Sequence, residues 1–213
     1  MIPAHLQNLD WYPGHLAWVN EKYMVVFHGW VAGVPPVQAD LSGRVFSGAD
    51  LSGADLSGAE CYNTNFTGAV LGCTDFYCAD LTCADFTGAD FTRTGPVGSD
   101  FYGAILRGAK LPGVELSDAD FGDAVLDGAD ITGAKLPGAE FSFSSLIGAD
   151  FSVADLTGAD FYRADCTRAD FSRADLRDAD FTRAIIDGAN FDGADLRGAI
   201  GLPDAIMAAG ATH

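Results

Sequence analysis

The sequence predicts an all-β repeat fold in which short extended segments alternate with turns. A five-residue unit, in its purest form Ala-Asp-Leu-Ser-Gly, recurs thirty-two times from Ala39 to Gly198 without a change of register. The middle position of the unit holds fourteen Leu, thirteen Phe, two Ile, two Cys and one Pro. Ala stands two residues before it in twenty-five units, and Gly stands two residues after it in eighteen. Such an internal repeat outweighs any local pattern as a predictor of fold.

A period of five excludes one long helix and one flat strand. In an α-helix the middle residues would spiral around all sides, and each Gly would cost about 0.8 to 1 kcal/mol relative to Ala. In a strand the side chains alternate with period two, so a residue that recurs every five positions would change faces. The chain must therefore turn once in every unit. We expect the Ala and the middle residue to point inward, the residue between them outward, and the last two residues to form the turn.

The unit resembles the motif of the pentapeptide-repeat family, Ala-(Asp/Asn)-(Leu/Phe)-X-X, over residues 39–198. The resemblance implies a right-handed quadrilateral β-helix, a solenoid in which four units make one coil, and hence about eight coils. We expect three parts: residues 1–38 as an N-terminal cap or docking segment, residues 39–198 as the β-helix, and residues 199–213 as a short C-terminal cap helix with a tail.

Residues 1–38 lack the clean repeat and hold all three Trp residues. A solenoid exposes strand edges and core side chains at its ends, so an aromatic cap is expected here. The alternative is a docking or dimer surface made by Trp11, Tyr12 and Trp18, because Trp and Tyr anchor many interfaces. At the other end, Pro203 and the Ala-rich sequence after it indicate a short helix.

If four units make one coil, second-position residues 20 apart share a side. One side is then acidic at every level: Asp40, Glu60, Asp80, Asp100, Asp120, Glu140, Asp160 and Asp180. These carboxylates can bond nearby backbone N–H groups, as the motif itself implies, or they can bind a partner. A column of like charges costs stability unless one of these interactions offsets it. A rim of tyrosines is expected beside this side: Tyr62, Tyr102 and Tyr162.

The next side carries the least charge. Its apolar members are Val45, Ile105, Val125 and Ile185. They are either scattered surface residues, which are normal, or an aligned contact face for docking or dimerisation. Five arginines near the C-terminal end are expected to form surface pairs of small energetic value with Asp on neighbouring sides of the coil: Arg163, Arg168, Arg173, Arg177 and Arg183.

The formal net charge is −18, which disfavours binding to nucleic acid or anionic membranes and favours a basic partner. No signal peptide or transmembrane span is evident, and the five Cys are expected to be free thiols in the cytoplasm. Cys73, Cys78 and Cys83 recur every five residues, but successive corners would point them apart, so we expect no zinc site. We expect no cofactor either.

The repeats contain no His and no pocket-forming insertion, so we expect a non-catalytic, protein-binding solenoid. Some pentapeptide-repeat proteins, among them the fluoroquinolone-resistance proteins, mimic DNA and bind DNA gyrase or topoisomerase IV. The resemblance implies an acidic DNA mimic of this kind, although long loops are missing and the C-terminal segment is short for a dimerising helix. The alternative is a rigid structural or adaptor component of a larger assembly, such as a virion or a secreted complex, attached through residues 1–38.

Overall fold

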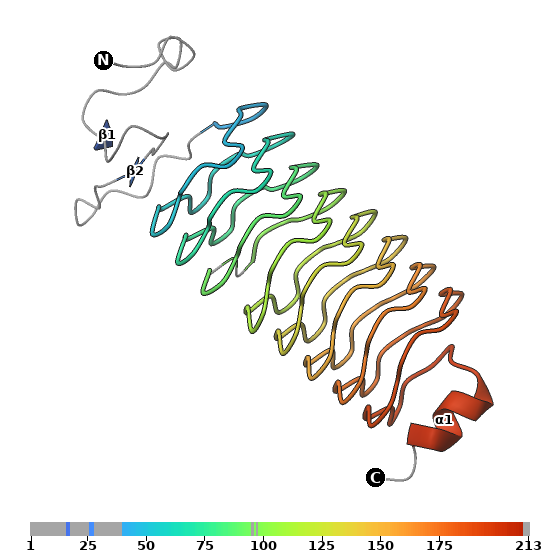
Figure 1. Ribbon diagram of the computed structural model, residues 1–213. Coiled ribbons are helices and arrows are strands. Elements are labelled where there is room, and N and C mark those ends of the chain that lie inside the picture. The colour runs from blue at the N-terminus through green and yellow to red at the C-terminus, as the bar shows by residue number, and fades with distance from the viewer. Residues whose placement is uncertain (1–15, 18–25, 28–39, 95, 97, 211–213) are drawn as a thin grey trace.

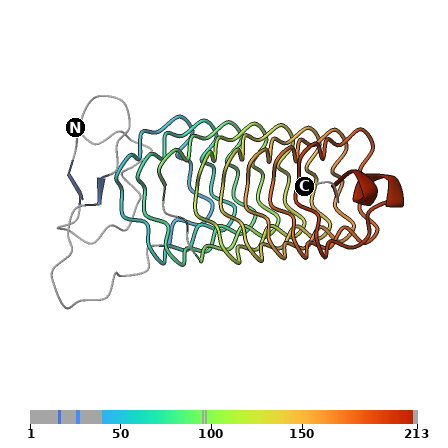
Figure 2. The same ribbon diagram turned by 90° about the horizontal axis from the view of Figure 1, so that it is seen from below.

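The computed structural model describes residues 16–17, 26–27, 40–94, 96 and 98–210. From residue 40 to residue 200 the chain winds into a rod of stacked coils (Figure 1, Figure 2). Parallel bridges join residues that are 20 apart, so four units make each coil, as the resemblance implies. Outside the rod, β1 (Leu16–Ala17) pairs antiparallel with β2 (Val26–Phe27), and α1 spans Asp204–Gly210.

Each unit contributes one short bridge and one turn, as the unit that begins at Ala49 illustrates. The Leu51 N–H donates to the carbonyl of Val70 at 2.8 Å, and the Val70 N–H donates back to the carbonyl of Ala49 at 2.9 Å. The Ala54 N–H then donates to the carbonyl of Leu51 at 2.9 Å and closes the turn. Because this pattern recurs through the rod, the backbone groups of one coil are paired mainly with the neighbouring coils.

The last position of every unit has a left-handed backbone. Eighteen of these positions are Gly and fourteen are other residues, all with positive φ. A side chain in this region costs roughly 1 to 2 kcal/mol, which explains why Gly is so frequent there. Phe143 at φ 62° and Val153 at φ 61° occupy this position although they lack the conformational freedom of Gly. Both side chains are also exposed.

The interior of the rod is filled as the period of five predicted. Nearly all Ala and middle-position side chains of the coils are buried, and the Phe rings stack from coil to coil. Some Ala positions hold a buried hydroxyl instead. Thr64 and Thr74 donate from Oγ1 to the carbonyls of Leu41 and Leu51, at 2.8 and 2.9 Å, so these polar groups are satisfied.

The helix α1 follows Pro203 and lies beyond the last coil (Figure 1). Leu202, Ile206 and Met207 pack against the buried core. Among the described residues, no helix has the length and apolar character needed to cross a membrane.

Candidate functional site: an acidic side and an aromatic corner

The acidic side is defined here as the column Asp40, Glu60, Asp80, Asp100, Asp120, Glu140, Asp160 and Asp180. Bridges join each member to the next, so the structure places all eight in one line along the rod. Successive members are separated by about 4.8 Å, the ordinary strand spacing. The members up to Asp100 and Glu140 are exposed, whereas Asp120, Asp160 and Asp180 are half-buried. The column therefore presents its charge most openly toward the N-terminal half of the rod.

The aspartates of this side also serve the turns. Oδ1 of Asp80 accepts the N–H of Thr82 at 3.0 Å, and Oδ1 of Asp100 accepts the N–H of Tyr102 at 2.8 Å. Asp120 does the same for Gly122 at 2.7 Å. One carboxylate oxygen is thus committed to the backbone, which supports the interpretation that the motif aspartate stabilises the turn. At these three levels the second oxygen is left for solvent or a partner, whereas Oδ2 of Asp160 accepts from Oγ of Ser142 at 3.1 Å.

The turns do not require a negative charge, however. Asn65 and Asn190 accept the same backbone N–H bond from residues two positions later, at 2.9 and 3.0 Å. On the neighbouring side, Val45 and Ile185 occupy the equivalent position with no carboxylate at all. Full acidic occupancy of one side is therefore more than the fold needs. The stability of the turns therefore does not explain why every level of this side carries a negative charge.

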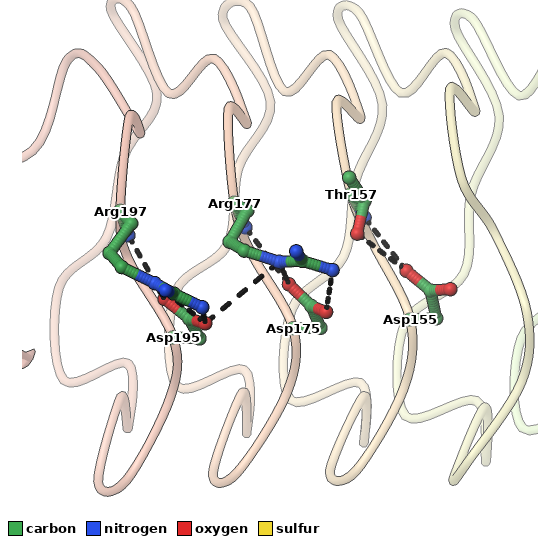
Figure 3. Close-up of polar contacts among 6 residues, drawn as sticks. All are labelled: Asp155, Thr157, Asp175, Arg177, Asp195 and Arg197. Atoms are coloured by element: carbon green, nitrogen blue, oxygen red, sulfur yellow. Dashed lines mark hydrogen bonds and ion pairs between the residues drawn. The ribbon is translucent and has the colours of Figure 1, made fainter. Parts of the chain in front are cut away.

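On the side that carries Asp155, Asp175 and Asp195, the last two carboxylates are paired with arginines (Figure 3). Arg177 donates from Nε to Oδ1 of Asp175 at 2.8 Å, and Arg197 donates from Nε to Oδ1 of Asp195 at 2.8 Å. Arg177 also lies 3.9 Å from Oδ2 of Asp195, so the pairs form a short ladder. Within the described part of the chain, no carboxylate of the acidic side has such a salt bridge. Its carboxylates are therefore free of direct ion pairs to the described residues.

A stack of Phe rings supports the acidic side from within at the levels from Asp100 to Asp180. The middle residues behind it include Phe121, Phe141 and Phe161, whose rings are fully buried. The ring centroids of Phe121 and Phe141 are 5.1 Å apart, and those of Phe141 and Phe161 are also 5.1 Å apart, with interplanar angles of 4°. Close-packed interiors resist deformation, so this stack should hold the carboxylates in a regular array.

We name the least charged side, the column from Val45 to Ile185, the neutral side. The corner between it and the acidic side gathers aromatic and cationic groups. We name Phe143, Tyr162 and Arg163 the aromatic corner. The rings of Phe143 and Tyr162 meet edge to face with centroids 5.7 Å apart. The guanidinium of Arg163 lies 5.6 Å from the Phe143 centroid and 5.4 Å from the Tyr162 centroid. Sequence reasoning missed this cluster, although Phe143 and Arg163 stand 20 residues apart at last positions, which was a usable signal.

The prediction that these arginines pair with Asp is correct only for Arg177, which pairs with Asp175 and Asp195 of its own side. Within the described residues, the other four form no salt bridge: Arg163, Arg168, Arg173 and Arg183. Arg163 stacks on rings instead, and Arg183 donates to the Tyr162 hydroxyl.

Of the predicted tyrosine rim, Tyr62 and Tyr102 are exposed beside the acidic side, and the Tyr102 hydroxyl donates to Asp123. Tyr162 is half-buried within the aromatic corner.

The neutral side is less continuous than the sequence alone suggested. Val45 is 70% exposed and Ile185 is 49% exposed, but they lie toward opposite ends of the column. Ile105 and Val125 are bridged neighbours, and both are half-buried. The structure therefore brings together only these two of the four proposed contacts.

The proposed docking residues Trp11, Tyr12 and Trp18 lie outside the described residues. All five cysteines are free, and Cys73 and Cys78 are exposed. No three His, Cys, Asp or Glu side chains in the described coils are arranged to hold a metal ion.

The arginine-paired aspartates predict acid sensitivity. The hydrogen bond from the Arg197 side chain lowers the pKa of Asp195 to about 2, and the bond from Arg177 lowers the pKa of Asp175. Unfolded Asp titrates near 3.9, so the folded chain binds fewer protons, and this stabilisation is present above about pH 4 and lost as the pH falls toward 2. Urea unfolding measured from pH 5 to pH 2.5 should show decreasing stability. Asp195→Asn should reduce that slope, and an unchanged slope would contradict this assignment.

Comparisons with known proteins agree with the repeat architecture. A family model described as pentapeptide repeats matches the chain in eight copies, over residues 37–72, 73–93, 97–123, 124–162 and 164–200. No curated protein sequence matches the chain.

Among solved structures, HetL is a pentapeptide repeat protein involved in heterocyst differentiation regulation from the cyanobacterium Nostoc sp. Strain PCC 7120. It is 29% identical over 78% of this chain and 87% of its own, with a TM-score of 0.37. Full-length QnrB1, a plasmid-mediated fluoroquinolone resistance protein, is 19% identical over 82% of this chain and 96% of its own, with a TM-score of 0.52. The likeness to QnrB1 is one of fold.

Proposed function

Because this chain belongs to the pentapeptide-repeat family, whose repeats imply a right-handed quadrilateral β-helix, we propose that it is a non-catalytic protein-binding rod that mimics DNA. Its partner is a type II topoisomerase such as DNA gyrase or topoisomerase IV. The acidic side occupies the basic surface on which the enzyme binds duplex DNA. The observation that carries the proposal is the acidic side itself, which is complete at all eight levels and free of ion pairs to the described residues.

Charge density supports a duplex-like surface. Residues 39–158 hold eighteen acidic and five basic side chains, a net charge of −13, whereas residues 159–198 hold nine and six, a net charge of −3. At about 4.8 Å per coil, the first segment spans roughly 29 Å and carries about one net charge per 2 Å. Duplex DNA carries one charge per ~1.7 Å of its axis, and a protein that grips its backbone responds to that density without reading sequence. The first segment is therefore the part of the rod that competes with DNA.

The hydrogen bonds of the acidic side separate its charge from its structural role. Asparagine accepts the same turn bond elsewhere in the rod, so a motif that served only the fold would tolerate neutral residues on this side too. Glu60 and Glu140 continue the charge at two levels with a longer side chain. The side chain thus varies along the acidic side while the negative charge is kept at every level. A surface that binds cations requires this charge.

A supercoiling assay tests the proposal. Purified protein should inhibit gyrase-catalysed supercoiling of relaxed plasmid in a dose-dependent way. Inhibition should weaken as the salt concentration rises, because ions screen exposed charges beyond about 10 Å at 0.1 M. Absence of inhibition at micromolar protein, for both gyrase and topoisomerase IV, would contradict the proposal. A structural role as a rigid adaptor would then be the better account of the rod.

A further inference from the structure

Phe143 is an exposed aromatic residue in a backbone conformation that disfavours it. Its side chain is 52% exposed, and its φ of 62° lies in the left-handed region. Gly43 and Gly103 fill the same corner position in other coils, with φ of 66° and 63°. A bulky side chain is strained in the left-handed region, and because Phe143 is exposed, burial of its ring does not offset this strain. Such strain tends to persist at functional sites, where the surrounding structure holds the residue in place.

The guanidinium of Arg163 is held in position by the rings of Phe143 and Tyr162. It has no salt bridge within the described residues, so its N–H donors remain available on the outer face of the corner. The Tyr162 hydroxyl accepts a long hydrogen bond of 3.4 Å from Nη1 of Arg183. Two rings and a guanidinium thus form one preorganised group, which lowers the entropy cost of engaging a partner.

The aromatic corner is joined to the acidic side. The Tyr162 N–H donates to Oδ1 of Asp160 at 2.7 Å, and Ser142 donates from Oγ to Oδ2 of the same residue at 3.1 Å. Glu140 lies one level away and is exposed. A partner that covers these carboxylates must also cover the corner. Carboxylates this close to Arg163 would repel the phosphates of a nucleic acid, so the charge of the site selects a protein.

We propose that Phe143, Tyr162 and Arg163 anchor the basic protein partner on the acidic side. This inference rests on the proposed function. The partner surface presents cations to Glu140 and Asp160, an apolar side chain to the Phe143 ring, and a carboxylate to the Arg163 guanidinium. Tyr and Arg are enriched among the few residues that dominate binding energy, and aromatic residues are enriched at the cores of interfaces. The acidic side governs the rate of encounter, and the anchor governs how long the complex lasts.

The chain offers a matched pair of substitutions. Phe143→Gly removes the ring where the backbone favours Gly. Val153→Gly removes another exposed side chain from a left-handed position, at the opposite corner of the same coil. Val153 is also 52% exposed, and its φ is 61°. Neither change alters the charge, and neither should lower the urea midpoint of unfolding, because both relieve a left-handed side chain. Any difference in binding between the two variants then reports on the anchor.

Surface plasmon resonance with immobilised DNA gyrase holoenzyme tests the inference. Phe143→Gly should accelerate dissociation by about tenfold or more while leaving the salt dependence of association unchanged. Val153→Gly should match the wild type within about twofold, as expected for a surface residue outside an interface. If wild type binds and Phe143→Gly dissociates no faster than Val153→Gly, the inference is overturned and the proposed function stands. If the wild type itself does not bind, both fail together.

Discussion

Replacing Phe141 by alanine should destabilise the rod by about 3 to 5 kcal/mol, the usual cost of removing a buried phenyl ring. The Phe141 ring is fully buried and stacks against two neighbouring rings at 5.1 Å, so the substitution leaves a cavity that three coils share. Because each coil contacts only its neighbours, the damage should weaken the coupling of the two halves of the rod. Urea denaturation followed by circular dichroism measures the loss.

The control for this substitution lies two residues away. Phe143→Ala deletes the same atoms from an exposed side chain and keeps a non-glycine residue in the left-handed position. It should lower the free energy of unfolding by no more than about 1.5 kcal/mol, because only the exposed contacts with Tyr162 and Arg163 are lost. Equal losses at the two positions would show that ring burial does not hold the rod together.

Removing three charges from the acidic side should weaken binding to gyrase by roughly 10- to 100-fold. The variant combines Asp80→Asn, Asp100→Asn and Asp120→Asn, which keep the acceptor oxygen for the turn N–H. Exposed charge pairs contribute up to about 1 kcal/mol each, and 1.4 kcal/mol corresponds to a factor of ten. The variant should also respond less to salt. Titration calorimetry or plasmon resonance at two salt concentrations gives both quantities.

A control of equal charge is available on another side of the rod, the column that contains Asp90, Asp130 and Asp150. Asp90, Asp130 and Asp150 accept the same turn bonds, from Thr92, Thr132 and Ser152 at 2.9, 3.1 and 2.9 Å. Their replacement by Asn changes the net charge by the same amount on a different face. Binding should weaken by no more than about threefold, because only the long-range field is altered. Comparable losses from both faces would indicate general charge attraction and would leave the acidic side without a specific role.

Much of the fold was predictable because the period of the repeat restricts the path that the chain can take. A period of five is compatible with a buried column only if the chain turns once per unit, and the burial of the Ala and middle residues confirms this. The bridge between Asp80 and Asp100 follows from the same register, so the acidic side was predictable once four units were assigned to a coil. The turn was likewise predicted at the last two residues of each unit, and the structure adds that the last residue is left-handed.

The candidate site was predictable only in part, because side-chain partners depend on rotamers and on contacts between coils. Sequence spacing placed the carboxylates in a column, but it did not show that Asp175 is paired with Arg177 while Asp100 has no salt bridge in the described coils. It assigned Arg163 to an aspartate, whereas the structure stacks it on Phe143. A guanidinium can stack on an aromatic ring or pair with a carboxylate. Which of the two it does depends on how the side chains pack at the corner.

The amino-acid sequence by itself determined the register of this protein. Its period specified which residues point into the core and where the chain turns, and the family resemblance added which residues share a side. The tertiary structure decided which charges are neutralised and which remain free, and which exposed side chains meet at a corner. Those outcomes depend on contacts between residues 20 or more apart, where geometry in three dimensions selects among partners that the sequence leaves equivalent.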